Sequence, residues 1–236
     1  MPDALPLVVL TRPQAASDRF AAQLLARFQV RVLIATLQEI VFLPQEPVGE
    51  DIKGLIFTSQ NGVFAWNRLE NAPNVPAFCV GPQTTSLARE MGLQATNCGG
   101  DAQAVIDTIT ALRPAAPLLH MRGEHGRGRI AERLTAAGIA TVERVTYRQV
   151  ERTPSAELIA VLDDPQAIVP LFSPRSAALF QKALPQGALP QLAVISQAVA
   201  DSLDAALQHR MIRARTPDLE GMLDAIEICL GARTAP

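Results

Sequence analysis

The chain has few aromatic side chains, few cysteines and no long run of one charge. Aromatic residues make up 4% of the 236 residues, while hydrophobic residues as a whole reach 48%. The core must therefore be built chiefly from Leu, Val, Ile and Ala. The formal net charge is −2, and without a basic run a general nucleic-acid surface is not expected.

The cysteines and the missing motifs exclude further classes. Cys79, Cys98 and Cys229 are odd in number and widely spaced, which favours a reducing compartment over disulfides or a zinc site. No H-E-x-x-H, C-x-x-C, Walker A or G-x-S-x-G sequence is present, so a metal site, a P-loop and a serine hydrolase are not expected. No run approaches the ~18 apolar residues of a membrane helix, and no secretion signal is recognisable. We expect a soluble, cytoplasmic protein.

The two halves of the chain resemble each other in the same order of segments. Residues 56–63 (IFTSQNGV) recur in outline as residues 170–177 (PLFSPRSA), 114 positions later. Three other pairs of segments recur with shifts of 110 to 117 residues, and one of them aligns Arg12 with Arg122. Such spacing predicts two copies of one domain, because the period is far too long for a solenoid or propeller. Two such domains are expected to form a cleft for a small molecule.

Short apolar runs alternate with amphipathic stretches along the chain. The runs are rich in Val, Ile and Leu with little alternation, as in strands buried on both faces. Between them apolar residues recur at helical spacing, as in the stripe of Ile106, Ile109 and Leu112. This pattern predicts α/β domains with parallel sheets covered by helices. The expected strands are 7–10, 30–34, 54–57, 77–80, 118–121, 141–146, 167–172, 192–195 and 211–214.

Turns that contain serine, threonine or glycine follow several of the predicted strands. Such residues cap the free amides of a helix start, and in an open parallel sheet these turns gather at the carboxyl ends of the strands, where ligands bind. Free helix-start amides favour anions, so the sequence predicts anion-binding loops in both halves. For any one serine, a cap without a ligand is the simpler interpretation. The number of such turns at equivalent places favours a binding role.

Arginines lie in similar positions. Arg12 and Arg122 follow the first strand of each repeat, and Arg127, Arg129 and Arg175 lie at predicted helix starts. The helix dipole disfavours a cation there. An anionic ligand is one explanation for these arginines, and surface solvation or an ion pair with Asp or Glu is the other.

Tyr147 is the only tyrosine, and it lies where the chain is expected to pass between the domains. A single tyrosine is most often half-buried packing with its hydroxyl at the rim. With an ordinary pKa of about 10 it stays protonated at neutral pH, so it is also able to donate a proton. Of the three histidines, His120 lies in a predicted core strand, where packing is its expected role.

Taken together, these segments resemble the uroporphyrinogen-III synthase family. The segments that carry the resemblance, in the family's order, are LTRP at 10–13, IFTSQNGV at 56–63, VGPQT at 80–84, YR at 147–148, FSP at 172–174 and TP at 216–217. Each is short, but together they cover nearly the whole chain. The resemblance implies a cofactor-free hydro-lyase of tetrapyrrole biosynthesis. Such an enzyme closes hydroxymethylbilane to uroporphyrinogen III, expelling water and inverting the last pyrrole ring through a spiro intermediate.

The resemblance also implies two flavodoxin-like α/β domains joined by a two-stranded linker. Domain one would combine residues 1–36 with 152–236, and domain two would cover 43–146. The linker strands would be 37–42 and 147–151. A monomer is expected, with hydroxymethylbilane as substrate, uroporphyrinogen III as product and no nucleic-acid or membrane partner. Hand-over of the substrate from hydroxymethylbilane synthase is a further expectation.

By the same resemblance, Tyr147 is the expected proton donor to the leaving hydroxyl. Two departures from the family's pattern concern the loops: Gln60 and Asn61 replace a proline-containing version of their motif, and Val199 stands where threonine is common. Both changes can alter substrate grip, and neither touches Tyr147. The expected substrate-binding residues are Thr11, Arg12, Ser59, Gln60, Asn61, Gly81, Thr84, Arg122, Ser173, Pro174, Ser196 and Thr216.

Three other functions are open on the sequence alone. A two-domain small-molecule-binding protein or sensor would share the architecture and bind without turnover. A nucleotide-dependent transferase or reductase is disfavoured, because residues 123–128 read G-x-x-G-x-G and not the G-x-G-x-x-G of a dinucleotide fold. A synthase domain retained only as a regulatory module is disfavoured by the presence of Tyr147.

Overall fold

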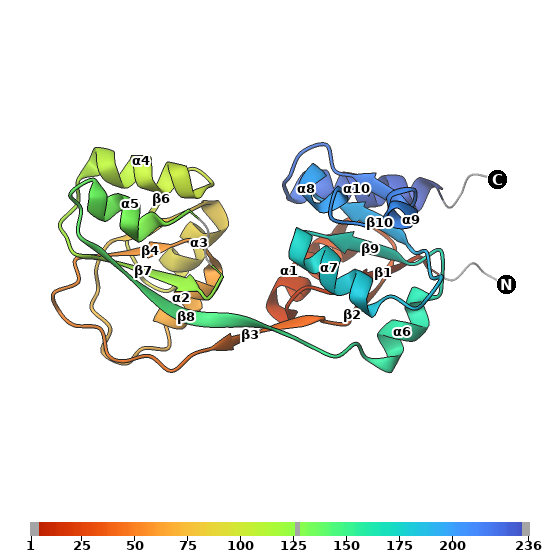
Figure 1. The fold of residues 1–236 in the computed structure, drawn as a ribbon, viewed down its shortest axis with the longest axis horizontal. Coiled ribbons are helices and arrows are strands. Elements are labelled where there is room, and N and C mark those ends of the chain that lie inside the picture. Colours follow the sequence, from red (N-terminus) through yellow and green to blue (C-terminus); the bar gives the residue numbers. More distant parts are fainter. Residues whose placement is uncertain (1–4, 126–127, 233–236) are drawn as a thin grey trace. The chain divides into compact units, whose positions relative to one another are not determined.

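The structure is a computed structural model that describes residues 5–125 and 128–232. Figure 1 shows two compact units, each built around one sheet. Unit 1 contains the described residues up to Glu39 and those from Val150 onward, and unit 2 contains Ile40–Gln149. The two mainly parallel sheets confirm the predicted α/β class, whereas the domain boundaries expected from the resemblance stay a prediction.

Unit 1 holds a five-stranded sheet covered by helices on both faces. Its strands are β1 (Leu7–Leu10), β2 (Arg31–Ile34), β9 (Ile168–Leu171), β10 (Gln191–Val194) and β11 (Met211–Arg213). Its helices are α1 (Gln14–Arg27), α6 (Ala156–Leu162), α7 (Pro174–Ala183), α8 (Gln197–Ala200), α9 (Ala205–Gln208) and α10 (Leu219–Ala232). The strand order is β11-β10-β9-β1-β2, and each neighbouring pair is parallel. Helices α1 and α10 pack on one face, and α6 to α9 pack on the other.

Unit 2 is built in the same way. Its strands are β3 (Gln38–Phe42), β4 (Gly54–Phe57), β5 (Ala77–Cys79), β6 (Ala95–Asn97), β7 (Leu118–Gly123) and β8 (Thr141–Glu151). Its helices are α2 (Gln60–Trp66), α3 (Pro82–Glu90), α4 (Ala102–Leu112) and α5 (Ile130–Ala136). The strand order is β3-β8-β7-β4-β5-β6, with β8 to β6 parallel throughout. Helices α2 and α3 cover one face, and α4 and α5 cover the other. Strands β3 and β8 run on from unit 2 into unit 1.

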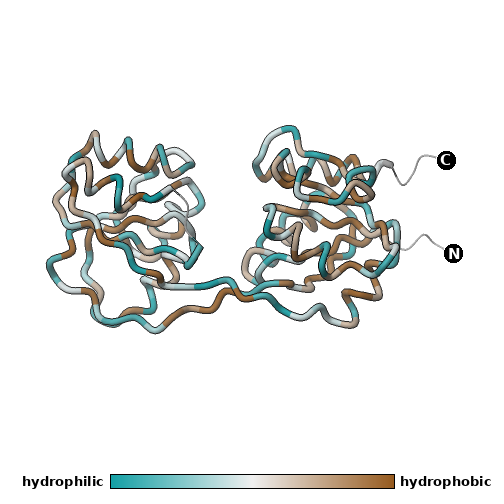
Figure 2. The backbone as a smooth tube through the Cα atoms, viewed as in Figure 1, coloured by the Kyte–Doolittle hydropathy of each residue, from teal (hydrophilic) through white to brown (hydrophobic). Residues whose placement is uncertain are grey.

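The cores lie between each sheet and its helices. Figure 2 shows hydrophobic segments along the central strands of each unit and hydrophilic segments in the connections. All four residues of β4, and likewise of β9, are buried. Both faces of these strands are covered, which explains why they read as continuous apolar runs without alternation. Among the described helices, none has the length and hydropathy of a membrane span.

The repeat in the sequence is a repeat in topology. In the sheet of unit 2, β6-β5-β4-β7-β8 follow one another as β11-β10-β9-β1-β2 do in unit 1. The matched segments at 56–63 and 170–177 form the end of β4 with the start of α2, and the end of β9 with the start of α7. The predicted duplication of one fold is therefore confirmed.

The predicted elements differ from the structure in a few places. All nine predicted strands are present, although β8 continues well beyond residue 146. Strand β6 is not among the predicted strands, because only Ala95 of its three residues is buried and the segment makes no apolar run. The predicted apolar face of α4 is buried at Ile106 and Ile109, as expected. The prediction is wrong for Leu112, which is 58% exposed at the C-terminal end of the helix.

Candidate active site

In unit 2 the carboxyl ends of β4 and β5 lead directly into α2 and α3. Ser59 caps α2, since its hydroxyl oxygen accepts a hydrogen bond from the Asn61 amide at 3.2 Å. Gln60 reaches the neighbouring turn, where its side-chain amide donates to the Gln83 carbonyl oxygen at 3.2 Å. The two helix starts are thus linked, as expected for turns that follow adjacent parallel strands. Ser59 therefore caps a helix, which is the simpler of the two interpretations of this serine.

The start of α3 is open at its cap. Gly81 occupies the N-cap position, and a Cβ atom built there would meet only the Gly100 Cα atom, at 3.9 Å. Thr85 lies behind this turn and donates its hydroxyl to the Gly81 carbonyl oxygen at 2.9 Å. Thr84, in the first turn of α3, is only 6% exposed, so little of its surface is accessible to a ligand. The binding roles of Gly81 and Thr84 stay predictions.

At the end of β7 the guanidinium of Arg122 is held by groups of unit 2. It pairs with Glu143 on β8 at 2.6 Å and donates to the carbonyl oxygens of Gly123 at 2.9 Å and Glu124 at 3.1 Å. The hydrogen bond from Arg122 holds the pKa of the Glu143 carboxyl below its usual range. The ion pair named as the alternative to an anionic ligand therefore exists at Arg122, and its role in binding stays a prediction.

His120 lies deep in the same face of the sheet. It is 3% exposed, and its Nε2 atom is 3.3 Å from the Thr58 hydroxyl oxygen. Its Nδ1 atom has no hydrogen-bond partner within the described residues. Burial lowers the pKa of His120 to about 4, so the imidazole is neutral at neutral pH. The strand register places Glu143 directly beside it on β8. Sequence reasoning predicted the burial of His120 but not these neighbours, because they depend on strand register.

Tyr147 lies on β8 with its ring covered, and the residue is 8% exposed. The ring of Phe42, from β3, is 6.4 Å away between centroids and tilted by 56°. The Arg68 guanidinium lies over Phe42 at 3.8 Å from the ring centroid. Within the described part of the chain, the Tyr147 hydroxyl makes no hydrogen bond. It is also not one of the fully buried polar atoms that lack a hydrogen-bond partner. A covered ring with an uncommitted hydroxyl suits a group that meets a ligand.

In unit 1, Arg12 follows β1 and has no acidic partner among the described residues. Its guanidinium lies over the ring of Phe172, 4.1 Å from the centroid, and Phe172 packs edge-on against Phe20 at 4.9 Å. Burial, and secondarily the charge of Arg19, lowers the pKa of Arg12 to about 10. Thr11 is 2% exposed, and its hydroxyl oxygen lacks a partner within the described chain. An anion here would offset the desolvation of the cation.

The turns after β9 and β10 differ in how their hydroxyls are used. Ser173 and Ser176 form a capping box, in which the Ser176 amide donates to Ser173 Oγ at 3.1 Å and the Ser173 amide donates to Ser176 Oγ at 3.0 Å. Pro174 occupies the first helical position of α7, as suits proline. Ser196 stands at the N-cap of α8 without a side-chain cap bond. Val199 is 1% exposed and belongs to the core, so it offers a ligand nothing.

The turn before α10 places Thr216 against a glycine. The Thr216 hydroxyl donates to an Asp218 carboxylate oxygen at 3.0 Å, and the same oxygen accepts the Gly221 amide at 2.8 Å. A Cβ atom on Gly221 would lie 2.6 Å from the Thr216 hydroxyl oxygen. The loop conformation of Thr216 therefore depends on a residue that the sequence motif did not single out.

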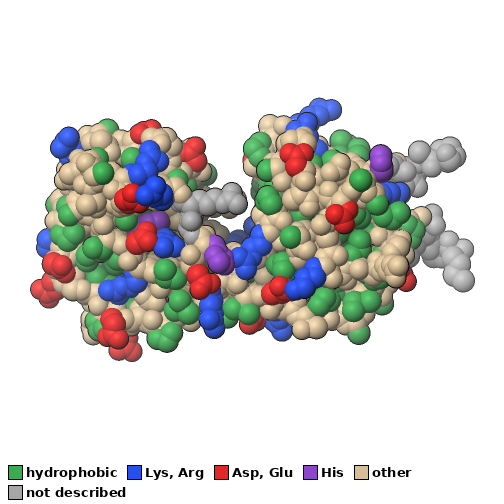
Figure 3. Space-filling model, viewed as in Figure 1, with side chains coloured by type: hydrophobic (Ala, Val, Ile, Leu, Met, Phe, Trp, Pro, Cys, Tyr) green, Lys and Arg blue, Asp and Glu red, His purple; other side chains and the backbone are tan. Residues whose placement is uncertain are grey.

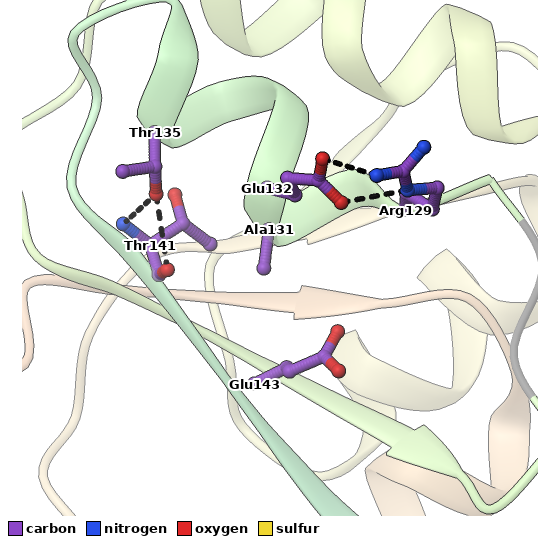
Figure 4. Close-up of a pocket in the computed structure, with 6 residues that line it drawn as sticks. All are labelled: Arg129, Ala131, Glu132, Thr135, Thr141 and Glu143. Carbon is purple, nitrogen blue, oxygen red and sulfur yellow. Dashed lines mark hydrogen bonds and ion pairs between the residues drawn. The ribbon is translucent and has the colours of Figure 1, made fainter.

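A cavity of about 390 Å³ lies between α5 and β8 (Figure 4). Its polar side chains already have partners: Arg129 is ion-paired with Glu132, and Thr135 and Thr141 exchange hydrogen bonds at 3.2 Å. Glu143 is bonded to Arg122. Arg129 needs no anionic ligand to explain it, and Arg127 lies outside the described residues. The cavity is lined by Arg129, Ala131, Glu132, Thr135, Thr141 and Glu143.

Figure 3 shows basic and acidic side chains interspersed over the visible face of each unit, with no extended area of one sign on that face. Within the described residues, no group of three or more His, Cys, Asp or Glu side chains is arranged to hold a metal ion. On this face, anion binding would therefore depend on individual groups more than on a broad basic surface.

The family comparison decides among the functions left open by the sequence. The family model described as "Uroporphyrinogen-III synthase HemD" matches residues 18–224. The chain belongs to the uroporphyrinogen-III synthase family. Uroporphyrinogen-III synthase family members are hydro-lyases of tetrapyrrole biosynthesis, so the enzyme class follows from this membership. No curated protein sequence matches the chain significantly.

Solved structures of uroporphyrinogen-III synthases resemble this chain. The uroporphyrinogen-III synthetase from Helicobacter pylori 26695 shares 20% sequence identity with a TM-score of 0.70, over 97% of this chain and 100% of that one. A mutant uroporphyrinogen III synthase from the extremely thermophilic bacterium Thermus thermophilus shares 14% identity with a TM-score of 0.48, over 96% of this chain and 99% of that one. The first likeness confirms the fold of the family.

Proposed function

We propose that this protein converts hydroxymethylbilane to uroporphyrinogen III, as a hydro-lyase of tetrapyrrole biosynthesis that uses no cofactor. The observation that carries the proposal is the family match over residues 18–224. The duplicated α/β topology and the fold likeness to the Helicobacter pylori enzyme support it.

The chemistry asks for positioning more than for strong acid or base. Hydroxymethylbilane is a linear tetrapyrrole with eight carboxylates, and loss of its hydroxyl as water gives a conjugated azafulvenium cation. Direct closure of this cation yields the type I isomer without help. The enzyme must instead hold the chain so that a spiro intermediate forms and the last ring is inverted. Holding reacting atoms in such a geometry is a large source of rate and selectivity.

Tyr147 donates the proton to the leaving hydroxyl in this proposal. Its ring is covered, and its hydroxyl makes no hydrogen bond within the described residues. The packing of the ring holds the phenol in position, and the hydroxyl has no protein partner that a substrate would have to displace, which supports the role of proton donor. A general acid of this kind contributes roughly 10²- to 10⁴-fold to a rate.

The carboxylates bind at the strand-end turns of both units. In unit 1, Arg12 holds one of them, a role supported by a desolvated guanidinium that has no acidic partner among the described residues. Thr11, beside it in the chain, is a further proposed contact. In unit 2, the open cap at Gly81 offers free amides to another. The remaining proposed contacts are Ser59, Gln60, Asn61, Thr84, Arg122, Ser173, Pro174, Ser196 and Thr216.

The organisation of the enzyme follows the family. Domain one consists of residues 1–36 and 152–236, domain two of 43–146, and the strands 37–42 and 147–151 connect them. The enzyme acts as a cytoplasmic monomer that receives its substrate from hydroxymethylbilane synthase. The resemblance to the family supports the monomer and the hand-over, and the three unpatterned cysteines support a reducing compartment.

An isomer assay tests the function. Hydroxymethylbilane is generated in place, the protein is added, and the oxidised products are separated into uroporphyrins I and III. Mostly isomer III, lost when the protein is boiled first, is the expected result. Only isomer I, as in the protein-free blank, would overturn the proposal in favour of a binding module. Added nucleotide should leave the melting temperature unchanged, whereas a nucleotide-dependent enzyme would be stabilised by its ligand.

A further inference from the structure

The ring of Tyr147 lies directly against the backbone of Gly123. A Cβ atom built on Gly123 would lie 2.7 Å from Cε2, 2.9 Å from Cζ and 3.1 Å from the hydroxyl oxygen of Tyr147. Non-bonded carbon atoms pack at about 3.5–4.0 Å, so any side chain larger than hydrogen would collide with the phenol. The contact extends along the ring edge as far as the hydroxyl.

The backbone conformation does not require glycine at this position. Among the described residues six other glycines have a positive φ, including Gly128 and Gly138, but Gly123 is not one of them. It is the last residue of β7 and pairs with β8. The feature that excludes a side chain at Gly123 is therefore the phenol ring.

An irregularity in the sheet brings the two residues together. The register between β7 and β8 shifts after Arg122, so that Arg122 pairs with Val145 and Gly123 pairs with Tyr147, leaving Thr146 between them. Beyond the shift, the Glu124 amide donates to the Tyr147 carbonyl oxygen at 2.9 Å. A bulge of this kind re-aims a side chain, and bulges are frequent next to active sites.

Packing alone sets the position of the phenol. Its hydroxyl makes no hydrogen bond in the described part of the chain, and Phe42 is the aromatic ring beside it. If a methyl group were added at Gly123, the ring would have to shift by roughly 1 Å to regain normal contact distances. A misplacement of that size at a reacting group can cost on the order of 10²-fold in rate.

We propose that Gly123 is a positioning residue for Tyr147: the missing side chain seats the phenol on the strand and so fixes where its hydroxyl meets the substrate. The kinetic consequence rests on the proposed function, whereas the packing of the Tyr147 ring against Gly123 does not. Gly123→Ala is expected to lower kcat about tenfold to a hundredfold with little change in KM. In a Tyr147→Phe background the same substitution is expected to lower kcat by less than about twofold, because the hydroxyl is already gone. An equal loss in both backgrounds would overturn the proposal.

Gly54→Ala is the matched control. Gly54 begins β4, at the opposite end of the same sheet, and a Cβ atom there would lie 2.8 Å from Leu118 Cδ2. This variant strains the core of unit 2 without touching Tyr147, so it is expected to lower stability and leave kcat unchanged. If folded Gly54→Ala protein lost as much kcat as Gly123→Ala, the loss would be a general effect of strain and the positioning role would be rejected.

A spectroscopic readout separates this inference from the proposed function. Tyr147 is the only tyrosine, so fluorotyrosine incorporated into the protein gives a single fluorine NMR signal that reports this site alone. The signal is expected to move in Gly123→Ala and to stay in place in Gly54→Ala. If Gly123→Ala leaves the signal unmoved, Gly123 does not position the Tyr147 ring and the inference is overturned. If the signal moves in Gly123→Ala but the wild-type protein makes no isomer III, the positioning of the Tyr147 ring by Gly123 stands and the synthase function is rejected.

A second variant keeps the test decisive if Gly123→Ala does not fold. In Gly123→Ala/Tyr147→Leu the ring that the methyl group meets is absent, so the double variant is expected to fold and melt close to Tyr147→Leu alone. Failure of the double variant to fold would show that Gly123 has another structural role and would overturn the inference.

Discussion

Three arginines near the carboxyl ends of strands differ in what their guanidinium groups contact. Arg122 is bonded to Glu143 and to two backbone carbonyls, and Arg129 is paired with a glutamate of its own helix. Arg12 lies over an aromatic ring and has no acidic partner among the described residues. A desolvated charge without a partner is costly, so Arg12 has the strongest physical reason to bind a substrate carboxylate.

Replacing Arg12 should weaken substrate binding. Arg12→Gln removes the charge but keeps a polar side chain, and a hydrogen bond to a charged group is worth about 1.5–3 kcal/mol. KM is therefore expected to rise roughly tenfold to a hundredfold, with kcat less affected. Steady-state kinetics of isomer III formation measures both. Arg129→Gln is the control, because Arg129 is exposed and already paired. Equal KM values for the two variants would contradict the role of Arg12.

Removing the Tyr147 hydroxyl should slow turnover without disturbing the fold. The hydroxyl makes no hydrogen bond within the described residues, so Tyr147→Phe is expected to melt near the wild-type temperature. Because the azafulvenium cation forms readily, kcat should fall by about a hundredfold, at the low end for general acids. Turnover at saturating substrate is the measurement. An unchanged kcat would remove Tyr147 as the proton donor.

At the scale of elements, the turn after β4 and strands β7 and β8 bring polar groups together around the buried His120 in unit 2. His120 lies on β7 between the Thr58 hydroxyl and Glu143, which in turn is bonded to Arg122. The pKa of His120 is lowered to about 4, mainly by burial. The folded protein therefore resists protonation at a position where the unfolded chain accepts a proton near pH 6.5.

This difference predicts acid sensitivity with a defined sign. Below pH 6.5 the unfolded chain binds a proton that the folded chain excludes, so stability is lost as the pH falls from about 6.5 to about 4. The contribution is at most about 3 kcal/mol. His120→Gln lacks this titration. The unfolding free energy of wild type minus that of the variant should therefore fall by up to about 3 kcal/mol between pH 7 and pH 4. Glu143 titrates in both proteins and largely cancels. Denaturant unfolding across this pH range measures the difference, and a constant difference would contradict the assignment.

Helix α10 depends on a close approach at its start. Gly221 contacts the Thr216 turn, and a Cβ atom on it would lie 2.6 Å from the Thr216 hydroxyl oxygen. Gly221→Ala is expected to destabilise the protein by about 1–3 kcal/mol and to raise KM, because Thr216 is displaced. Gly231→Ala, on the same helix, meets nothing within 4 Å and should leave melting temperature and KM nearly unchanged. Similar losses in both variants, measured by thermal melts and kinetics, would show that the helix is merely intolerant of alanine.

Across the whole molecule, the sequence predicts what is local and misses what depends on register. The helix starts at Ser59 and Ser173 were predictable because strand, cap and helix follow one another along the chain. The partner of Arg122 was not, because Glu143 lies 21 residues away on β8, and one residue of register reverses which face a side chain occupies. The contact between Gly123 and Tyr147 depends on a bulge in the same strand pair, for which the sequence carries no local signal.

Each unit has its own cores on the two faces of its sheet, so damage to one core should leave the other unit's unfolding in place. Phe180, in unit 1, is fully buried, and Phe180→Ala is expected to cost about 3–5 kcal/mol. Trp66 is the only tryptophan and lies in a core of unit 2, so its fluorescence follows unit 2 alone. During denaturant unfolding, Phe180→Ala should move part of the circular-dichroism transition to lower denaturant without moving the Trp66 transition. Phe57→Ala, a fully buried phenylalanine of unit 2, should move the Trp66 transition instead. If Phe180→Ala shifts the Trp66 transition as far as Phe57→Ala does, the two units unfold as one cooperative body.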